Sequence, residues 1–165
     1  GRTVVYLVRD GAQRWLAFRN LDELEPRLVP LDGDVSQPAI SPNGRQIAFV
    51  AVGGRNQLMR MNVDGSGLTT VLDNAAGTVG GGIAWLNDRE IVFTPRLNPG
   101  VGLSRVNVET GASAPLTHLD AANGDRYHIA PVVSADGALV FFTSTSTSAT
   151  ELHVGVLRVA DGRVA

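Results

Sequence analysis

Three segments of this chain repeat one pattern: an apolar strand, a tight polar turn, and a second apolar strand that ends in an aromatic residue. They cover residues 38–49, 83–93 and 131–142. A repeat with a period in the forties is typical of small structural units that stack on one another, because one such unit cannot bury its apolar faces alone. The repeat therefore constrains the architecture more strongly than any single motif in the chain.

Each repeat continues into a third and a fourth strand, joined by a turn such as Asp64-Gly65, Thr110-Gly111 or Asp161-Gly162. Glycine in these turns supplies the left-handed backbone that tight hairpins need. The sequence thus predicts an all-β chain, a β-propeller of four-stranded antiparallel blades. No segment of ten or more residues keeps a helical period, so almost no helix is expected.

The repeat divides the chain into about four blades within a single domain, residues 1–165. The predicted blades cover residues 1–30, 31–73, 78–117 and 126–165. The first blade enters at its turn, without its first strand, and the fourth strand of the last blade is short. We therefore expect a partial or half ring.

Composition excludes several kinds of site. The chain has no cysteine, and all 14 of its basic residues are arginine. Thiolate catalysis, cysteine-ligated metals and mechanisms that need a lysine are thereby removed. The net charge of −2 argues against a nucleic-acid partner. No run of about 18 apolar residues occurs, so no direct membrane insertion is expected.

The turn segments resemble the TolB-type β-propeller repeat, whose signature is Pro-x-x-Ser-Pro-Asp-Gly followed by an Ile-Ala-Phe-like strand. Ser41-Pro42-Asn43-Gly44 departs from it only by asparagine for aspartate. Ser134-Ala135-Asp136-Gly137 lacks the proline, and Trp85-Leu86-Asn87-Asp88 keeps only the turn geometry. The resemblance covers essentially the whole chain.

Three shorter stretches are also similar to the propeller attached to some bacterial serine/threonine receptor kinases. They are residues 80–93, residues 103–119, and residues 125–128 together with Pro131. In propellers of this type the first strands line a central channel, and the connections between second and third strands and between successive blades gather on one face. In this chain those connections vary in length and chemistry, as expected of recognition loops on a rigid scaffold.

The resemblance implies a non-enzymatic binding or sensor module that recognises a protein or a small ligand through this loop-rich face. The parent protein would be a receptor-type kinase or a TolB-like envelope protein, with an extracytoplasmic (periplasmic or cell-surface) location. The alternative is a propeller that gates a prolyl-oligopeptidase-like peptidase domain. A hydrolase or lyase acting in the channel itself has the least support, because no carboxylate pair, metal cluster or triad emerges from the spacing.

Five residues are predicted to bind the ligand. Arg126, Tyr127 and His128 lead into the last blade near the predicted channel mouth, where a cation, an aromatic ring and a titratable ring suit a ligand rim. Gln37 and Trp85, which belong to two earlier blades, are the other two predicted ligand residues. A packed role for His128 is the competing interpretation. No catalytic residue, metal ligand or cofactor is predicted.

Other polar and glycine positions are interpreted structurally. Asn43, Asn87 and Asp136 are expected to bond to the backbone of their own turns. Residues 62–67 look like the start of a calcium loop but lack the terminal glutamate and flanking helices, so we expect a hairpin turn. Glycines 80–82 lack a strand–loop–helix context for a dinucleotide and are expected to make room for a close strand.

The end blades lead to an expectation about assembly. A propeller's core lies between its blades, so an open row of blades leaves an apolar flank exposed at each end. We expect these flanks to be covered by homo-oligomerisation or by the remaining blades of a larger ring.

Overall fold

The computed structural model describes residues 3–11, 13–53, 56–73, 81–95, 102–146 and 152–165. Within these ranges the chain is all β except for one 3-10 turn, η1 (Ala121–Asn123), as the sequence predicted. Contacts divide the chain into two compact units, residues 1–74 and 75–165, each with two antiparallel sheets. In the described residues, no helix has the length and apolar character needed to span a bilayer.

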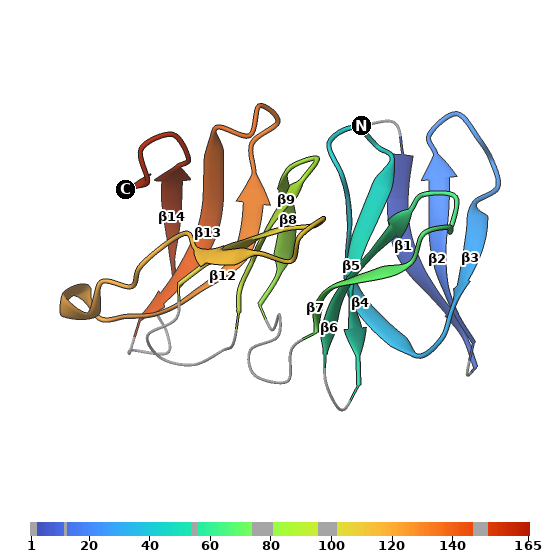
Figure 1. Cartoon of the computed structure of the whole chain (residues 1–165), viewed down its shortest axis with the longest axis horizontal. Coiled ribbons are helices and arrows are strands. Elements are labelled where there is room, and N and C mark those ends of the chain that lie inside the picture. Colours follow the sequence, from blue (N-terminus) through green and yellow to red (C-terminus); the bar gives the residue numbers. More distant parts are fainter. Residues whose placement is uncertain (1–2, 12, 54–55, 74–80, 96–101, 147–151) are drawn as a thin grey trace. The chain divides into compact units, whose positions relative to one another are not determined.

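The first unit contains one sheet of three strands and one of four (Figure 1). The first sheet has the order β1 (Thr3–Asp10), β2 (Gln13–Asn20), β3 (Arg27–Leu31). The second has the order β4 (Asp34–Ile40), β5 (Gln46–Val52), β6 (Gln57–Asn62), β7 (Thr69–Asp73). The first sheet has three strands and lacks a counterpart of β4, the edge strand of the second sheet.

The second unit contains two sheets of four strands. One has the order β8 (Ile83–Asn87), β9 (Glu90–Phe93), β10 (Ser104–Asn107), β11 (Ser113–Pro115). The other has the order β12 (Asp125–Val133), β13 (Leu139–Ser146), β14 (Leu152–Arg158), β15 (Arg163–Val164). Strand β15 is only two residues long, as the short fourth strand of the last repeat predicted.

Each unit has an apolar core between its two sheets. In the first unit, buried residues from β2 pack with buried residues from β5 and β6: Leu16, Phe18, Ile47, Phe49 and Met61. In the second unit the corresponding cluster is Leu86, Val92, Leu103, Val140, Phe142 and Leu157. Burying each such side chain contributes about 1.5–3 kcal/mol. Because successive residues of a strand face opposite sides, this core uses one face of each sheet.

The polar turns of the repeat are closed by their own side chains. The Ser41 hydroxyl donates to Asn43 Oδ1 (2.8 Å) and accepts from the Gln46 amide (3.0 Å). In the last sheet, Ser134 makes the same bonds with Asp136 (2.6 Å) and the amide of Leu139 (2.9 Å).

Other side chains in the turns accept hydrogen bonds from backbone amides of the same turn. The side-chain oxygens of Asn43, Asn87 and Asp136 accept from the amides of Arg45 (2.9 Å), Arg89 (2.9 Å) and Ala138 (3.0 Å). The structural interpretation of these three residues is confirmed. Residues 62–67 join β6 to β7, where Asp64 Oδ1 accepts from the amide of Ser66 (2.8 Å). The prediction of a hairpin turn there is confirmed.

Candidate functional site

The most elaborate polar cluster in the described residues surrounds His128, in the first half of β12. The side chain of His128 is 2% exposed, and its ring lies 4.3 Å from the ring of Phe142. Its Nδ1 lies 2.7 Å from Thr117 Oγ1, and its Nε2 lies 3.4 Å from Asp125 Oδ2. The carbonyl of His128 accepts from the Thr94 hydroxyl (3.1 Å). Both ring nitrogens therefore have partners inside the protein.

The bond to Asp125 assigns the tautomer of the neutral histidine ring. A carboxylate only accepts, so Nε2 carries the ring proton and donates it to Asp125 Oδ2. Nδ1 is then the acceptor for the Thr117 hydroxyl, whose oxygen also accepts from the amide of Leu103 (2.7 Å). Burial lowers the pKa of His128 below 6.5, although the hydrogen bond and charge of Asp125 partly oppose this shift. The neutral ring is the form that this network stabilises.

Asp125 connects the histidine to the chain segment that precedes β12. Its Oδ1 accepts from the Ser144 hydroxyl (2.7 Å) on β13, and its Oδ2 accepts from the amide of Asp120 (3.1 Å). Burial raises the pKa of Asp125, but hydrogen bonds from Ser144, Asp120 and His128 outweigh it and leave the pKa lowered. The cluster thus holds an ionised carboxylate that ties the connection to the sheet.

A close approach of two strands lies beside this cluster. A Cβ on Gly82, which has φ of 125°, would lie 2.9 Å from Cδ of Pro131 on β12. A Cβ on Gly81 would lie 2.8 Å from the side chain of Ile129. The prediction that glycine makes room for a strand is confirmed for these two positions, while Gly80 lies outside the described residues.

The predicted ligand residues occupy different environments. Arg126 is exposed, and its guanidinium lies 5.5 Å from the ring centroid of the half-buried Tyr127. Trp85 is buried, at 5% exposure, on β8. Gln37 lies in the first unit and has a positive φ of 55°. The burial of His128 favours its packed role, while a ligand role for Arg126 and Tyr127 stays a prediction.

Sequence reasoning missed three members of the cluster: Thr117, Asp125 and Ser144. The spacing of Asp125 and His128 on one strand was visible, but the other two come from distant elements. The variable loops predicted for recognition are residues 9–13, 52–56, 95–101, 119–129 and 144–150. Of these, residues 12, 54–55, 96–101 and 147–150 lie outside the described residues. Within the described part, no group of three or more histidine, aspartate or glutamate residues is placed to hold a metal ion.

No protein-family model matches this sequence, and no curated protein matches it at a significant level. Solved structures do match. One, described as a TolB from Agrobacterium tumefaciens, is 18% identical, with a TM-score of 0.78 over 100% of this chain and 60% of that chain. The chain has the TolB-type β-propeller fold.

Other structures that resemble this TolB-type propeller carry enzymatic names. An oligogalacturonate lyase in complex with manganese is 12% identical, with a TM-score of 0.68 over 97% of this chain and 51% of that chain. A puromycin-hydrolysing peptidase of Mycobacterium tuberculosis is 14% identical, with a TM-score of 0.73 over 100% of this chain and 29% of that chain. At these identities the likeness establishes the fold alone. The propeller described here spans no more than 60% of the length of these three proteins.

Proposed function

We propose that this chain is a non-enzymatic binding module that recognises a protein or a small ligand through the connection leading into β12. The observation that carries the proposal is the buried cluster of Thr117, Asp125, His128 and Ser144, which fixes a long exposed connection on a rigid sheet. Recognition residues are commonly placed on loops held by a rigid scaffold. In this proposal the chain is the regulatory region of a receptor-type kinase or belongs to a TolB-like envelope protein.

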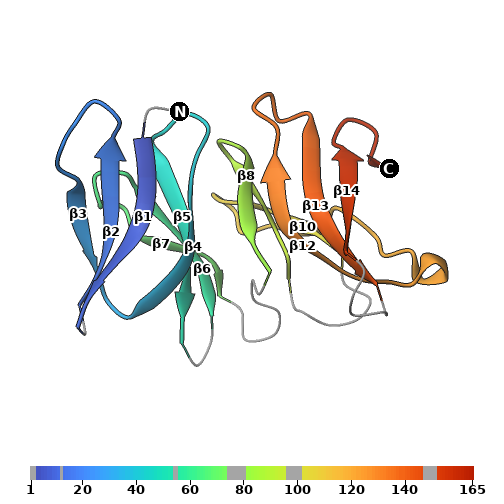
Figure 2. The same cartoon turned by 180° about the vertical axis from the view of Figure 1, so that it is seen from behind.

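The connection into β12 differs from the equivalent one in the first unit. Residues 116–124 separate β11 from β12, whereas only residues 32–33 separate β3 from β4. Its helical turn η1 projects beyond the sheets of the second unit in both views (Figures 1 and 2). His118, Asp120 and Arg126 are exposed along this connection and the start of β12. A structural link alone does not need this length.

The same cluster supports a non-enzymatic role. A general base must reach a substrate proton with an unshared nitrogen or oxygen. Nδ1 of His128 accepts from Thr117 and Nε2 donates to Asp125, so the buried ring has no nitrogen left for a substrate. We expect no turnover when the purified chain is screened against esters, glycosides and peptides. Clear activity in that screen would contradict the proposal.

The binding role is tested by capture from an envelope extract of the source organism, with the bound proteins quantified by mass spectrometry. The double variant Arg126→Ala/Tyr127→Ala removes the exposed cation and its ring without touching the buried cluster. We expect its specific partner to be retained at least about tenfold less than by the native chain, as for the loss of one interface hot spot. Arg45→Ala, a change at an exposed turn, is the matched control and should retain the partner. Equal capture by the double variant and the native chain would exclude this surface.

A peptidase-gating propeller is the second candidate, because of the likeness to the puromycin-hydrolysing peptidase. That likeness covers 29% of the peptidase, which leaves most of that enzyme outside the comparison. The complete gene distinguishes the candidates. A Gly-x-Ser-x-Gly nucleophile motif in the same open reading frame favours the peptidase, whereas a kinase signature with a membrane-spanning segment favours the sensor.

A further inference from the structure

The connection into β12 has one buried side chain. Among the described side chains of residues 116–124, Thr117 alone is buried, at 3% exposure, and the others are half-buried or exposed. The Thr117 oxygen accepts from the amide of Leu103 (2.7 Å), and the hydroxyl proton is donated to Nδ1 of His128 (2.7 Å). A segment with so few buried contacts is the kind of region that opens most readily in a folded protein. The closed form of the connection therefore depends on the state of the His128 ring.

A second proton on this ring would disrupt the arrangement. Nε2 already donates to Asp125, so the second proton can enter only at Nδ1. Nδ1 would then be a donor that faces the Thr117 oxygen, and the Thr117 hydroxyl proton would lose its acceptor. A buried hydroxyl without its acceptor, beside a cation without water, is unfavourable. Opening of the connection relieves both, because water then reaches the ring and the hydroxyl.

The groups around the ring leave burial as the dominant influence on its charge. Burial lowers the pKa of His128, and the hydrogen bond and charge of Asp125 oppose this shift without cancelling it. In the described part of the chain, Asp125 is the one charged group that acts on the ring. The neighbours from other elements are uncharged: Thr117 in the connection, Phe142 on β13 and Thr94 after β9. The closed connection thus favours the neutral ring.

Opening of the connection is consequently linked to the uptake of a proton. In the open form the ring meets water and its pKa returns toward 6.5, whereas in the closed form the pKa is lowered. The open form therefore binds more protons once the pH falls below about 6.5, and opening becomes more favourable in acid. Between pH of about 7.5 and about 5.5 the equilibrium constant for opening should rise about tenfold, because a solvated histidine gains its proton in that interval.

We propose that the connection into β12 is an acid-released segment, freed from the sheets when His128 takes up a proton. The Thr117 end lifts first, because protonation removes the acceptor of its hydroxyl. The Asp125 end stays longer, because Asp125 keeps its bond from Ser144 (2.7 Å) and gains a charged partner. The release is a property of the chain alone. Its consequence, that a partner bound through this connection dissociates in mild acid, rests on the proposed function.

Amide hydrogen exchange at pH of about 7.5 and about 5.5, corrected for the intrinsic rate at each pH, tests the release. The reporters are the amides of Leu103 and Asp120, which bond to Thr117 Oγ1 (2.7 Å) and Asp125 Oδ2 (3.1 Å). We expect their protection to fall about tenfold at the lower pH. The amide of Val159, which bonds to a carbonyl in the same unit (3.0 Å), should keep its protection. Unchanged protection at the two reporters, or an equal loss at Val159, overturns the proposal.

Two variants assign the response to His128. His128→Asn keeps a carboxamide oxygen that can accept from Thr117 but does not titrate, so its protection should be equal at both pH values. His118→Gln/His153→Gln removes the two exposed histidines and should keep the full response. A response that persists in His128→Asn, or that disappears in the double variant, overturns the proposal. If circular dichroism shows that His128→Asn does not fold, the double variant decides, because its single histidine must titrate together with the loss of protection.

Partner capture at the same two pH values separates the release from the proposed function. The probe is the envelope extract used to test binding. Retention that falls together with the protection of Asp120 supports both proposals. Retention that is equal at both pH values, while protection falls about tenfold, supports the acid release and contradicts binding through this connection. Protection that stays constant overturns the acid release, whatever the capture shows.

Discussion

The first strands of the second and fourth sheets, β4 and β12, share a backbone irregularity but are anchored in different ways. Each has a register shift at a left-handed residue that precedes proline, Gln37 in β4 and Ala130 in β12, with φ of 55° and 53°. β4 begins at Asp34, which lies 2.8 Å from Arg14 in an exposed ion pair. β12 instead begins in the buried cluster around His128. The repeat therefore specifies the backbone, while the polar anchors differ from sheet to sheet.

The two anchors should contribute differently to the free energy of unfolding. An exposed ion pair is solvated before and after folding, so its loss changes stability little. A buried hydrogen-bonded group that loses its partner costs about 1–3 kcal/mol, because nothing replaces the lost bond. We expect the connection before β12 to depend on its anchor far more than the start of β4 depends on Asp34.

The largest effect is expected for His128→Leu. This change removes the acceptor of the Thr117 hydroxyl and one of the two donors to Asp125 Oδ2, and the second unit should lose about 2–4 kcal/mol in free energy of unfolding. Urea unfolding in a Trp15→Phe background, where Trp85 alone reports on the second unit, measures the loss. A loss below about 0.5 kcal/mol would mean that the cluster is not an anchor.

Gly82→Ala comes next, at about 1–3 kcal/mol. The alanine would keep an unfavourable φ of 125° and would press its Cβ against Pro131. Gly33→Ala is the control, since it also has a positive φ (91°) but open space around its Cβ. The difference between the two variants isolates the contact with β12. Equal losses would show that the close approach contributes nothing.

Removing the serine hydroxyl of the repeated turn should destabilise the two units equally. Ser41→Ala and Ser134→Ala each remove a donor to the turn side chain and an acceptor for the amide that follows the turn. Each should cost about 1 kcal/mol in its own unit. Thermal unfolding, followed at Trp15 for Ser41→Ala and at Trp85 for Ser134→Ala, checks this. Losses that differ by more than about twofold would contradict an equivalent turn.

Acidification should weaken the second unit selectively. Since the pKa of His128 is lowered in the folded protein, the unfolded chain binds more protons once the pH falls below about 6.5, and stability decreases from there. The lowered pKa of Asp125 removes further stability as the pH falls below its ordinary value of 3.8. Urea unfolding between pH 7.5 and about 5 should show this loss in the native chain and not in His128→Leu. A pH response that persists in the variant would assign it to another group.

Asp34→Asn should have the smallest effect. Hydrogen bonds and charge from Arg14, followed by the charge and hydrogen bond of Arg9, lower the pKa of Asp34, yet the pair is open to solvent. We expect a shift in midpoint temperature that is small at low salt and vanishes near 1 M salt, where charges are screened within about 3 Å. A large loss that persists at high salt would remove the contrast between β4 and β12.

Much of this fold follows from the sequence because its determinants are local. The aromatic strand ends recur at a regular spacing, and the Asp-Gly turns are set by adjacent residues. Asn43, Asn87 and Asp136 bond to amides two positions further along the chain. The cluster around His128 was not predictable in this way. Thr117 reaches the ring from the connection after β11, and only the register of β12 on β13 brings Ser144 to Asp125. The division into two units was also not evident from an evenly spaced repeat.

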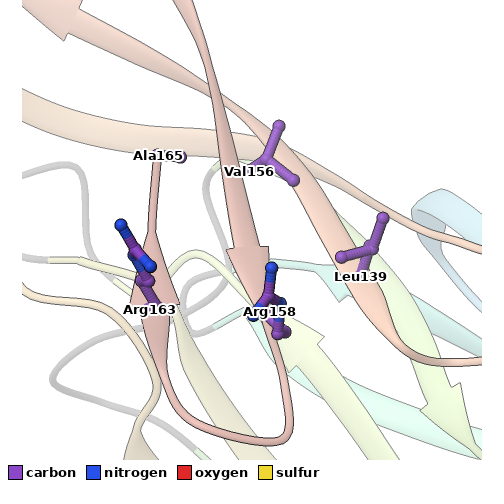
Figure 3. Close-up of a pocket in the computed structure, with 5 residues that line it drawn as sticks. All are labelled: Leu139, Val156, Arg158, Arg163 and Ala165. Atoms are coloured by element: carbon purple, nitrogen blue, oxygen red, sulfur yellow. The ribbon is translucent and has the colours of Figure 1, made fainter.

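The same reasoning explains why the sequence did not predict a cavity of about 300 Å³ in the last sheet, lined by Leu139, Val156, Arg158, Arg163 and Ala165 (Figure 3). Arg158 and Arg163 are separated by a turn and become neighbours only through the pairing of β14 with β15. In sequence they are two of 14 arginines with no distinguishing motif. Pairings that depend on register carry no signal in a single sequence.

Amide hydrogen exchange across residues 117–128 tests most directly whether the buried cluster holds the connection before β12. The amides of Asp120 and Asp125 bond to the Asp125 carboxylate and the Asp120 carbonyl, both at 3.1 Å. We predict that both amides are protected in the native chain and exchange at least about tenfold faster in His128→Leu, while amides of β4 keep their rates. Unchanged exchange at Asp120 and Asp125 in that variant would contradict the account.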